Sequence, residues 1–140
     1  MLLLSGCKKQ VVKCNLISDQ SASGYTMNVN INIYSKDNAV YKIVTEEEIS
    51  SNNNTILSYF QKQFNDQYEN YNKIYGGYTY KVNNKNGKVT AKVIIDYKKI
   101  DMKKFISANP AIKEYINKEN NLLLDGAKKM YESTGAKCEK

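Results

Sequence analysis

The chain has 140 residues, of which 41% are hydrophobic and 25% are charged, and a formal net charge of +7. This length and composition predict a single folded domain with its own hydrophobic core and exclude wholesale disorder. All 21 basic residues are lysines, and because arginine is the preferred residue for bidentate recognition of phosphates and guanine edges, its absence argues against nucleic-acid binding.

The first residues carry the pattern of a bacterial lipoprotein signal. Leu4, Ser5 and Gly6 place one apolar and two small side chains before Cys7, whose thiol can take a diacylglyceryl group as a thioether. We therefore expect residues 1–6 to be the end of a signal peptide, Cys7 to be lipidated, and 7–10 to tether a single domain over 11–140. A signal peptide has an apolar core of about 7–15 residues. Because the apolar run here is shorter, we expect either an upstream start codon or a fragment.

Three cysteines are an odd number, which needs an explanation in an exported protein. If Cys7 carries lipid, Cys14 and Cys138 remain near the two ends of the domain, where a disulfide is expected in an oxidising compartment. Closing so long a loop contributes about 4–5 kcal/mol in the chain-entropy model. The alternatives are a cytosolic protein with Cys7 as a free thiol, and two unrelated buried thiols at Cys14 and Cys138.

The first half of the chain predicts three strands. Residues 11–18 are rich in β-branched and apolar side chains, and a polar turn follows at 19–24. Over 27–33, apolar residues then alternate with asparagines, which predicts an antiparallel sheet with one covered and one wet face. A hairpin turn at 35–38 leads into a third strand over 40–49.

The second half predicts one helix, a hairpin and a helical tail. Ile56, Leu57, Phe60 and Phe64 recur at helical spacing, which predicts a helix over 55–71 after a polar stretch with several possible N-caps. We then expect a break at Gly76 and Gly77, followed by a hairpin with strands at 78–82 and 89–97 and a turn at 83–87. The tail is expected to contain a short helical turn at 102–106, a helix that begins at Asn109 and Pro110, and a last helix over 119–133 that ends at Gly135.

No catalytic constellation is present, so we expect no enzyme, no cofactor and no metal site. Without histidine the commonest general base is missing, and no Ser-His or Cys-His pair exists. The run Glu46 to Glu48 is expected to be a solvated strand end, because consecutive strand residues point to opposite faces. Asp96 and Asp101 could be paired carboxylates, but we expect capping of the following helix.

Tyrosines gather around the break between the first helix and the hairpin. We take Tyr71, Tyr75, Tyr78 and Tyr80 as a candidate ligand surface, because exposed aromatic rings stack on sugars and favour interfaces. Interleaved Lys73 and Lys81 add attraction to an acidic polymer. The alternative is that some of these rings belong to the core, which would favour a structural role.

The chain resembles the YehR-like family of small exported lipoproteins of unknown function. The resemblance rests on the lipobox ending at Cys7, on the strand order with its mid-chain helix, and on the segment 93–101 followed by a helical tail with a glycine near its end. It implies an α+β fold and an extracytoplasmic location, and it supplies no catalytic residues.

The sequence therefore predicts an α+β domain in β-β-β-α-β-β-α-α order, with an antiparallel sheet of about five strands and helices on one face. We expect a non-catalytic binding module at the extracytoplasmic face of the cell membrane, anchored by lipid. A cell-wall polymer or another envelope protein is a possible partner, and nucleic acid is not expected. The alternatives are a purely structural or accessory lipoprotein and an uncharacterised enzyme.

Overall fold

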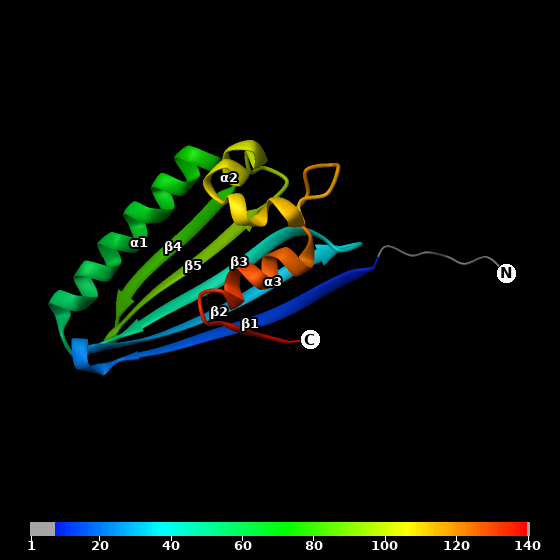
Figure 1. Ribbon diagram of the computed structural model, residues 1–140. Helices are drawn as coiled ribbons and strands as arrows, with labels where there is room; N and C mark the ends of the chain where they lie inside the picture. Colours follow the sequence, from blue (N-terminus) through cyan, green and yellow to red (C-terminus); the bar gives the residue numbers. More distant parts are fainter. Residues whose placement is uncertain (1–7, 140) are drawn as a thin grey trace.

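The computed structural model describes residues 8–139, so the expected signal segment and Cys7 lie outside the described residues. Six antiparallel strands form one sheet in the order β4-β5-β3-β2-β1-β6, and the helices cover one of its faces (Figure 1). The predicted α+β class is confirmed, with one strand more than expected. The strands are β1 (Lys9–Gln20), β2 (Tyr25–Lys36), β3 (Ala39–Ser50), β4 (Tyr78–Lys85), β5 (Lys88–Asp96) and β6 (Lys137–Cys138).

The alternating pattern of β2 separates the two faces of the sheet as predicted. Val29, Ile31 and Ile33 are buried beneath the helices, and Ile31 lies opposite Cys14 on β1 and Thr45 on β3. The asparagines between them lie on the open face, where Asn15 Nδ2 donates to the Oδ1 atoms of Asn28 (2.8 Å) and Asn30 (2.7 Å). Side-chain amides therefore line the uncovered face of the central strands.

Helix α1 (Asn54–Tyr75) lies along β4 and β5 and is longer than the predicted 55–71. The Asn53 side chain accepts the backbone N–H of Thr55 at 2.8 Å, which fixes the start of the helix. Leu57, Phe64 and Tyr68 are its buried residues, and further rings extend this apolar stripe toward Gly76, where the helix ends. Within residues 8–139, no helix combines the length and hydropathy needed to cross a membrane.

The tail after β5 contains less helix than predicted. Helix α2 (Met102–Ala108) is followed by a 3-10 helix η2 (Pro110–Tyr115) and by α3 (Leu124–Glu132). The expected helix start at residue 119 is wrong, because Asn120 has a positive φ of 61° and Asn117 Oδ1 accepts from the backbone of residues 119 and 121, which makes a turn. Leu122 then bonds to the sheet through its carbonyl, which accepts Val40 N–H at 2.8 Å.

The sixth strand brings the C-terminus to the free edge of β1. Cys14 and Cys138 are directly opposite in the β1–β6 register and form a disulfide across 124 residues of sequence. Glu139 N–H donates to the carbonyl of Lys13 at 2.9 Å, which extends the pairing. The predicted disulfide therefore joins the tail to the sheet and covers part of an edge strand.

Candidate functional site

The tyrosines predicted as a ligand surface pack between α1 and the β4–β5 hairpin. Tyr68 is only 6% exposed, and the rings of Tyr71, Tyr75, Tyr78 and Tyr80 are half-buried against it or one another. Ring centroids lie 5.6 Å apart for Tyr71 and Tyr78 and 6.1 Å apart for Tyr68 and Tyr80. Burial raises the pKa of Tyr78 to about 12, helped by Tyr71 and Tyr75. The cluster therefore joins the helix to the sheet.

The two lysines assigned to that surface do not converge on the rings. Lys73 is exposed on α1 and pairs with Glu69 at 3.2 Å. Lys81 is exposed on β4, one residue from Tyr80, and therefore on the opposite face of the sheet. The half-buried rings and these two lysines therefore do not share one face of the sheet.

The side chains of Glu46, Glu47 and Glu48 point alternately to the two faces of the sheet, and this corrects the prediction for Glu47. Glu46 is exposed and lies opposite Lys92, and Glu48 pairs with Lys88 at 3.3 Å. Glu47 points to the covered face between Val29 and Ala91, and burial there raises its pKa to about 7. The expectation of a solvated strand end is therefore wrong for Glu47, because an odd-numbered residue of β3 must share the face of Thr45 and Ile49.

The two aspartates suggested as paired carboxylates have separate local roles. Asp101 is the N-cap of α2, and its side chain accepts the backbone N–H of Lys104 at 3.1 Å. Asp96 accepts the backbone N–H of Lys98 at 3.0 Å within the preceding turn. Capping is confirmed for Asp101, and Asp96 stabilises a turn instead.

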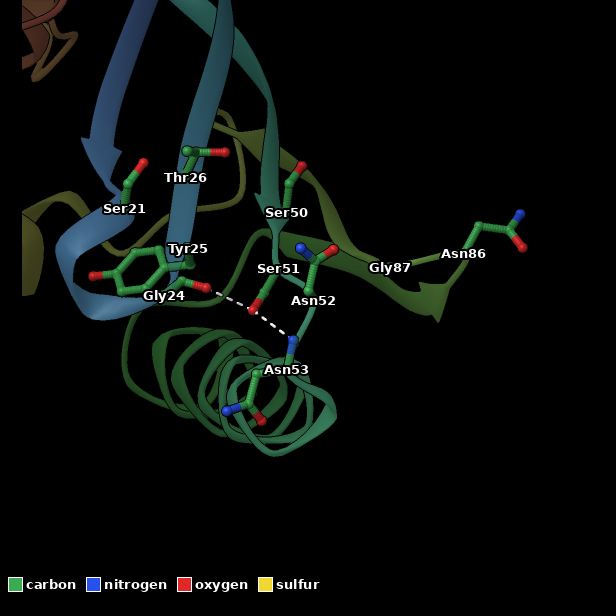
Figure 2. Close-up of a pocket in the computed structure, with 10 residues that line it drawn as sticks. All are labelled: Ser21, Gly24, Tyr25, Thr26, Ser50, Ser51, Asn52, Asn53, Asn86 and Gly87. Carbon is green, nitrogen blue, oxygen red and sulfur yellow. Dashed lines mark hydrogen bonds between the residues drawn. The ribbon is translucent and has the colours of Figure 1, made fainter.

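A pocket at the end of the sheet farthest from Lys9 is a candidate site, and we call it the distal pocket (Figure 2). Its cavity is about 590 Å³, and three connections supply its walls: the turn into β2, the segment between β3 and α1, and the β4–β5 turn. All ten lining residues are uncharged. They are Ser21, Gly24, Tyr25, Thr26, Ser50, Ser51, Asn52, Asn53, Asn86 and Gly87.

Hydrogen bonds hold the three connections together. Ser51 Oγ donates to the carbonyl of Gly24 at 2.7 Å and accepts the N–H of Asn53 at 3.0 Å, as Figure 2 shows. The backbone N–H of Ser51 donates to the carbonyl of Gly87 at 3.1 Å. Because one serine bonds to all three connections, the walls of the pocket are fixed before any ligand enters.

Glycine is required at position 24 for two reasons. Its φ is +91°, and a Cβ built there would lie 2.8 Å from Cδ1 of Ile56 on α1. Other residues rarely adopt this backbone conformation, and a side chain here would also force the end of the Ile56 side chain to move. The close approach of the turn to α1 therefore depends on this residue.

An adjoining hollow of about 490 Å³ shares Tyr25 with the distal pocket and is more apolar. Its walls include Ile56, Tyr59 and Phe60 from the start of α1. The rings of Tyr25 and Phe60 lie 4.8 Å apart, and Tyr59 is 58% exposed. An exposed aromatic surface therefore borders a cavity of hydroxyl and amide groups.

This arrangement suits the binding of an uncharged polar ligand. Serine, threonine and asparagine side chains donate and accept hydrogen bonds without charge, and aromatic rings stack on flat apolar faces of a ligand. The distal pocket contains no carboxylate, lysine or cysteine. Among residues 8–139, no group of three His, Cys, Asp or Glu side chains is placed to hold a metal ion.

The sequence predicted the turns that form this pocket but not their convergence. Turns were expected at 19–24 and 83–87, with a polar stretch at residues 50–54. In an all-antiparallel sheet, the end of β1, the end of β3 and the β4–β5 turn fall at one end when β3 pairs with β5. The alternating direction of successive strands, together with the pairing of β3 with β5, would have been enough to place the three turns together.

Comparisons with known protein sequences and structures identify a similar fold. No protein-family model matches the chain, and no curated protein sequence matches it significantly. The chain is similar to the NMR structure of YehR from Escherichia coli, with 16% identity, a TM-score of 0.61, and 96% of this chain and 94% of that chain covered. An NMR structure of a Streptococcus pneumoniae TIGR4 protein aligns at 16% identity and a TM-score of 0.48, over 99% of this chain and 91% of that one. The fold is therefore YehR-like.

Proposed function

We propose that this protein is a non-catalytic binding module of the cell envelope, anchored outside the cytoplasmic membrane by lipid on Cys7. The lipobox at Leu4 to Cys7 and the YehR-like fold support its membership of the YehR-like family of exported lipoproteins. The disulfide between Cys14 and Cys138 is consistent with an oxidising compartment.

The observation that carries the proposal is the position of the distal pocket. The chain reaches the sheet at Lys9, at the end opposite the pocket, so a tether on Cys7 would present the pocket away from the membrane (Figure 1). Each strand from β1 to β3 has 12 residues, which corresponds to about 40 Å of extended chain. The ligand would thus meet the protein at its outermost end.

The chemistry of the pocket favours a neutral ligand rich in hydroxyl and amide groups, such as a cell-wall glycan. Uncharged donors and acceptors match sugar hydroxyls and acetamide groups, and the ring of exposed Tyr59 offers a stacking surface beside them. A strongly acidic ligand would find no cation among the lining residues.

The anchor is tested by expressing the gene with its upstream codons, as wild type and as Cys7→Ala. We expect the wild type in the membrane fraction with an added lipid mass, and the variant without that mass. A wild-type product that is soluble and unmodified would contradict the anchor.

Ligand binding is tested by calorimetric titration of the folded Cys7→Ala chain with oligomers of N-acetylglucosamine. Asn52→Ala and Tyr59→Ala should each weaken binding by about 5–30-fold, since each removes a hydrogen-bonding or stacking group worth about 1–2 kcal/mol. Asn70→Ala, an exposed asparagine on α1 away from the pocket, is the matched control. Equal effects of Asn52→Ala and Asn70→Ala would contradict the site.

One observation favours a structural or accessory lipoprotein as the second candidate. The tyrosines that could have formed a ligand surface are used to join α1 to the sheet. An anchored protein that binds no envelope glycan would support this second function.

A further inference from the structure

A second pocket lies at the opposite end of the sheet, where β1 begins, and we call it the basal pocket. Its cavity is about 370 Å³, and its polar walls are Lys9, Lys36, Lys98, Tyr41, Tyr97 and Asn121. They come from the start of β1, the end of β2, the start of β3, the segment after β5 and the turn before α3. The basal pocket contains three lysines and no carboxylate.

The lysines of this pocket have no carboxylate partners in the described chain. Lys9 and Lys36 are directly opposite across β1 and β2, where like charges destabilise a sheet. The ion pairs among residues 8–139 are Lys62–Asp66, Lys73–Glu69 and Lys88–Glu48. Two carboxylates lie nearby without forming an ion pair with these lysines: Asp37 accepts the backbone N–H of Lys8, and Asp96 accepts the backbone N–H of Lys98.

Further lysines extend the positive charge around the pocket. Lys8 and Lys99 are exposed, and the ammonium of Lys42 lies 4.3 Å from the centroid of the Tyr34 ring beside the β2–β3 turn. The ammonium of Lys98 lies 5.7 Å from the Tyr41 centroid. This end of the molecule therefore carries more lysines than carboxylates, with Lys8, Lys9, Lys36, Lys42, Lys98 and Lys99 near Asp37 and Asp96.

We propose that the basal pocket and its surrounding lysines bind the phosphate groups of anionic phospholipids, so that this end of the sheet rests on the membrane surface. Lysine ammonium groups bind phosphate as point charges. Tyr97, which is 8% exposed, and Tyr41 form part of the pocket wall beside these lysines. The choice of a membrane over a soluble phosphate rests on the proposed tether, because Cys7 precedes Lys9 by two residues.

The attraction of the lysines does not itself require the lipid anchor, so it can be measured without it. The full-length Cys7→Ala chain is mixed with vesicles of phosphatidylglycerol and phosphatidylcholine, or of phosphatidylcholine alone, and the bound fraction is measured by sedimentation. We expect binding to the anionic vesicles only, with a strong decrease as salt is raised.

Two triple variants with the same change in net charge provide the critical contrast. Lys9→Gln, Lys36→Gln and Lys98→Gln together should weaken partitioning on the order of a hundredfold, since each lysine near an anionic surface contributes about fivefold. The matched control carries Lys81→Gln, Lys85→Gln and Lys88→Gln near the β4–β5 turn, at the distal end. Circular dichroism of both variants verifies that they fold.

Each outcome decides the proposal. Loss confined to the basal triple variant would support it. Equal loss in both variants, or equal binding to the two kinds of vesicle, would overturn it. Saturable binding of glycerol phosphate with no binding to anionic vesicles would instead assign the pocket to a soluble ligand. Because the anchor is tested separately by the mass of Cys7, failure of one proposal does not imply failure of the other.

Discussion

The turns at the two ends of the sheet use residues of the same kind, but the pockets at these ends differ in charge. At the basal end, Asp37 and Asn38 adopt positive φ in the β2–β3 turn, and at the distal end Asn86 and Gly87 do the same in the β4–β5 turn. The basal pocket is lined by three lysines, whereas all ten residues that line the distal pocket are uncharged; the lysines near the distal turn, Lys85 and Lys88, lie outside that pocket.

Backbone geometry therefore does not explain the difference in charge. A tight turn requires residues that tolerate positive φ, and both ends meet that requirement. Nothing in the fold requires Lys9 to lie opposite Lys36, or excludes charge from the ten residues of the distal pocket. We interpret this difference between the two pockets through the proposed contacts of each end, an anionic membrane surface and a neutral ligand.

The largest expected effect comes from removing the disulfide that joins the tail to β1 between the two ends. Replacing Cys14 and Cys138 together by serine should lower the free energy of unfolding by about 4 kcal/mol, because the closed loop spans 124 residues. Urea denaturation measures this change. Since β6 pairs near the middle of β1, both ends should lose stability together, and a change of less than about 1 kcal/mol would contradict a structural role.

The next largest effect tests the difference between the covered and the open face of β3. Burial raises the pKa of Glu47 to about 7 from an ordinary value of 4.5, so the folded state holds this proton more tightly than the unfolded state. The stability from this group is fully present below pH 4.5 and is lost as the pH rises to about 7. Glu47→Gln should therefore increase stability at pH 8 by up to about 3 kcal/mol.

Glu46→Gln is the matched control for this prediction, because Glu46 is the preceding residue and lies exposed on the open face. It should change stability by less than about 0.5 kcal/mol. Denaturation midpoints of the three proteins between pH 4 and 8 measure the difference. Parallel pH profiles for wild type and Glu47→Gln would show that Glu47 is not the group responsible.

A third change affects the distal end alone. Gly24→Ala places a Cβ at φ +91° and 2.8 Å from Cδ1 of Ile56, so we expect a loss of about 1–3 kcal/mol. Amide hydrogen exchange should accelerate around Ser51, whose hydroxyl bonds to the Gly24 carbonyl, and leave the basal end unchanged. If amide hydrogen exchange accelerated equally over the whole sheet, the result would contradict the expectation that the two ends open independently.

The smallest expected change in stability occurs at the basal end. Lys36→Glu replaces a like-charge pair with Lys9 by an opposite-charge pair, which should stabilise the fold by about 0.5 kcal/mol. The same variant should weaken binding to anionic vesicles about 30-fold, because two units of charge are lost. If Lys36→Glu bound anionic vesicles as strongly as the wild type, the result would contradict a role of the Lys9–Lys36 pair in membrane binding.

The sequence predicted those parts of the fold whose pattern is local. Alternation placed Val29, Ile31 and Ile33 on the covered face, and the cysteine count predicted the link between Cys14 and Cys138. The start of α3 was missed because Leu122 and Leu123 look helical by composition, whereas their backbones bond to the β2–β3 turn and to Tyr115. That choice depends on tertiary hydrogen bonds that no local window contains.

The candidate site was less predictable because it depends on how distant turns converge. Gly24 and Ser51 were recognisable as turn residues, but bringing the β4–β5 turn to Ser51 required the pairing of β3 with β5. The tyrosines near Gly76 were proposed as a ligand surface because of their density, and in the structure Tyr71, Tyr75, Tyr78 and Tyr80 are half-buried, so their role as a ligand surface stays a prediction.

The most direct test of the two-ended account is a map of amide chemical shifts in the Cys7→Ala chain. The spectrum is recorded with N-acetylglucosamine oligomers and, separately, with bicelles containing phosphatidylglycerol. The account predicts that the glycan shifts resonances of the distal pocket, such as Ser51 and Asn52, and that the bicelles shift those around Lys9, Lys36 and Lys98. Shifts from both titrants at the same end, or none from either, would contradict it.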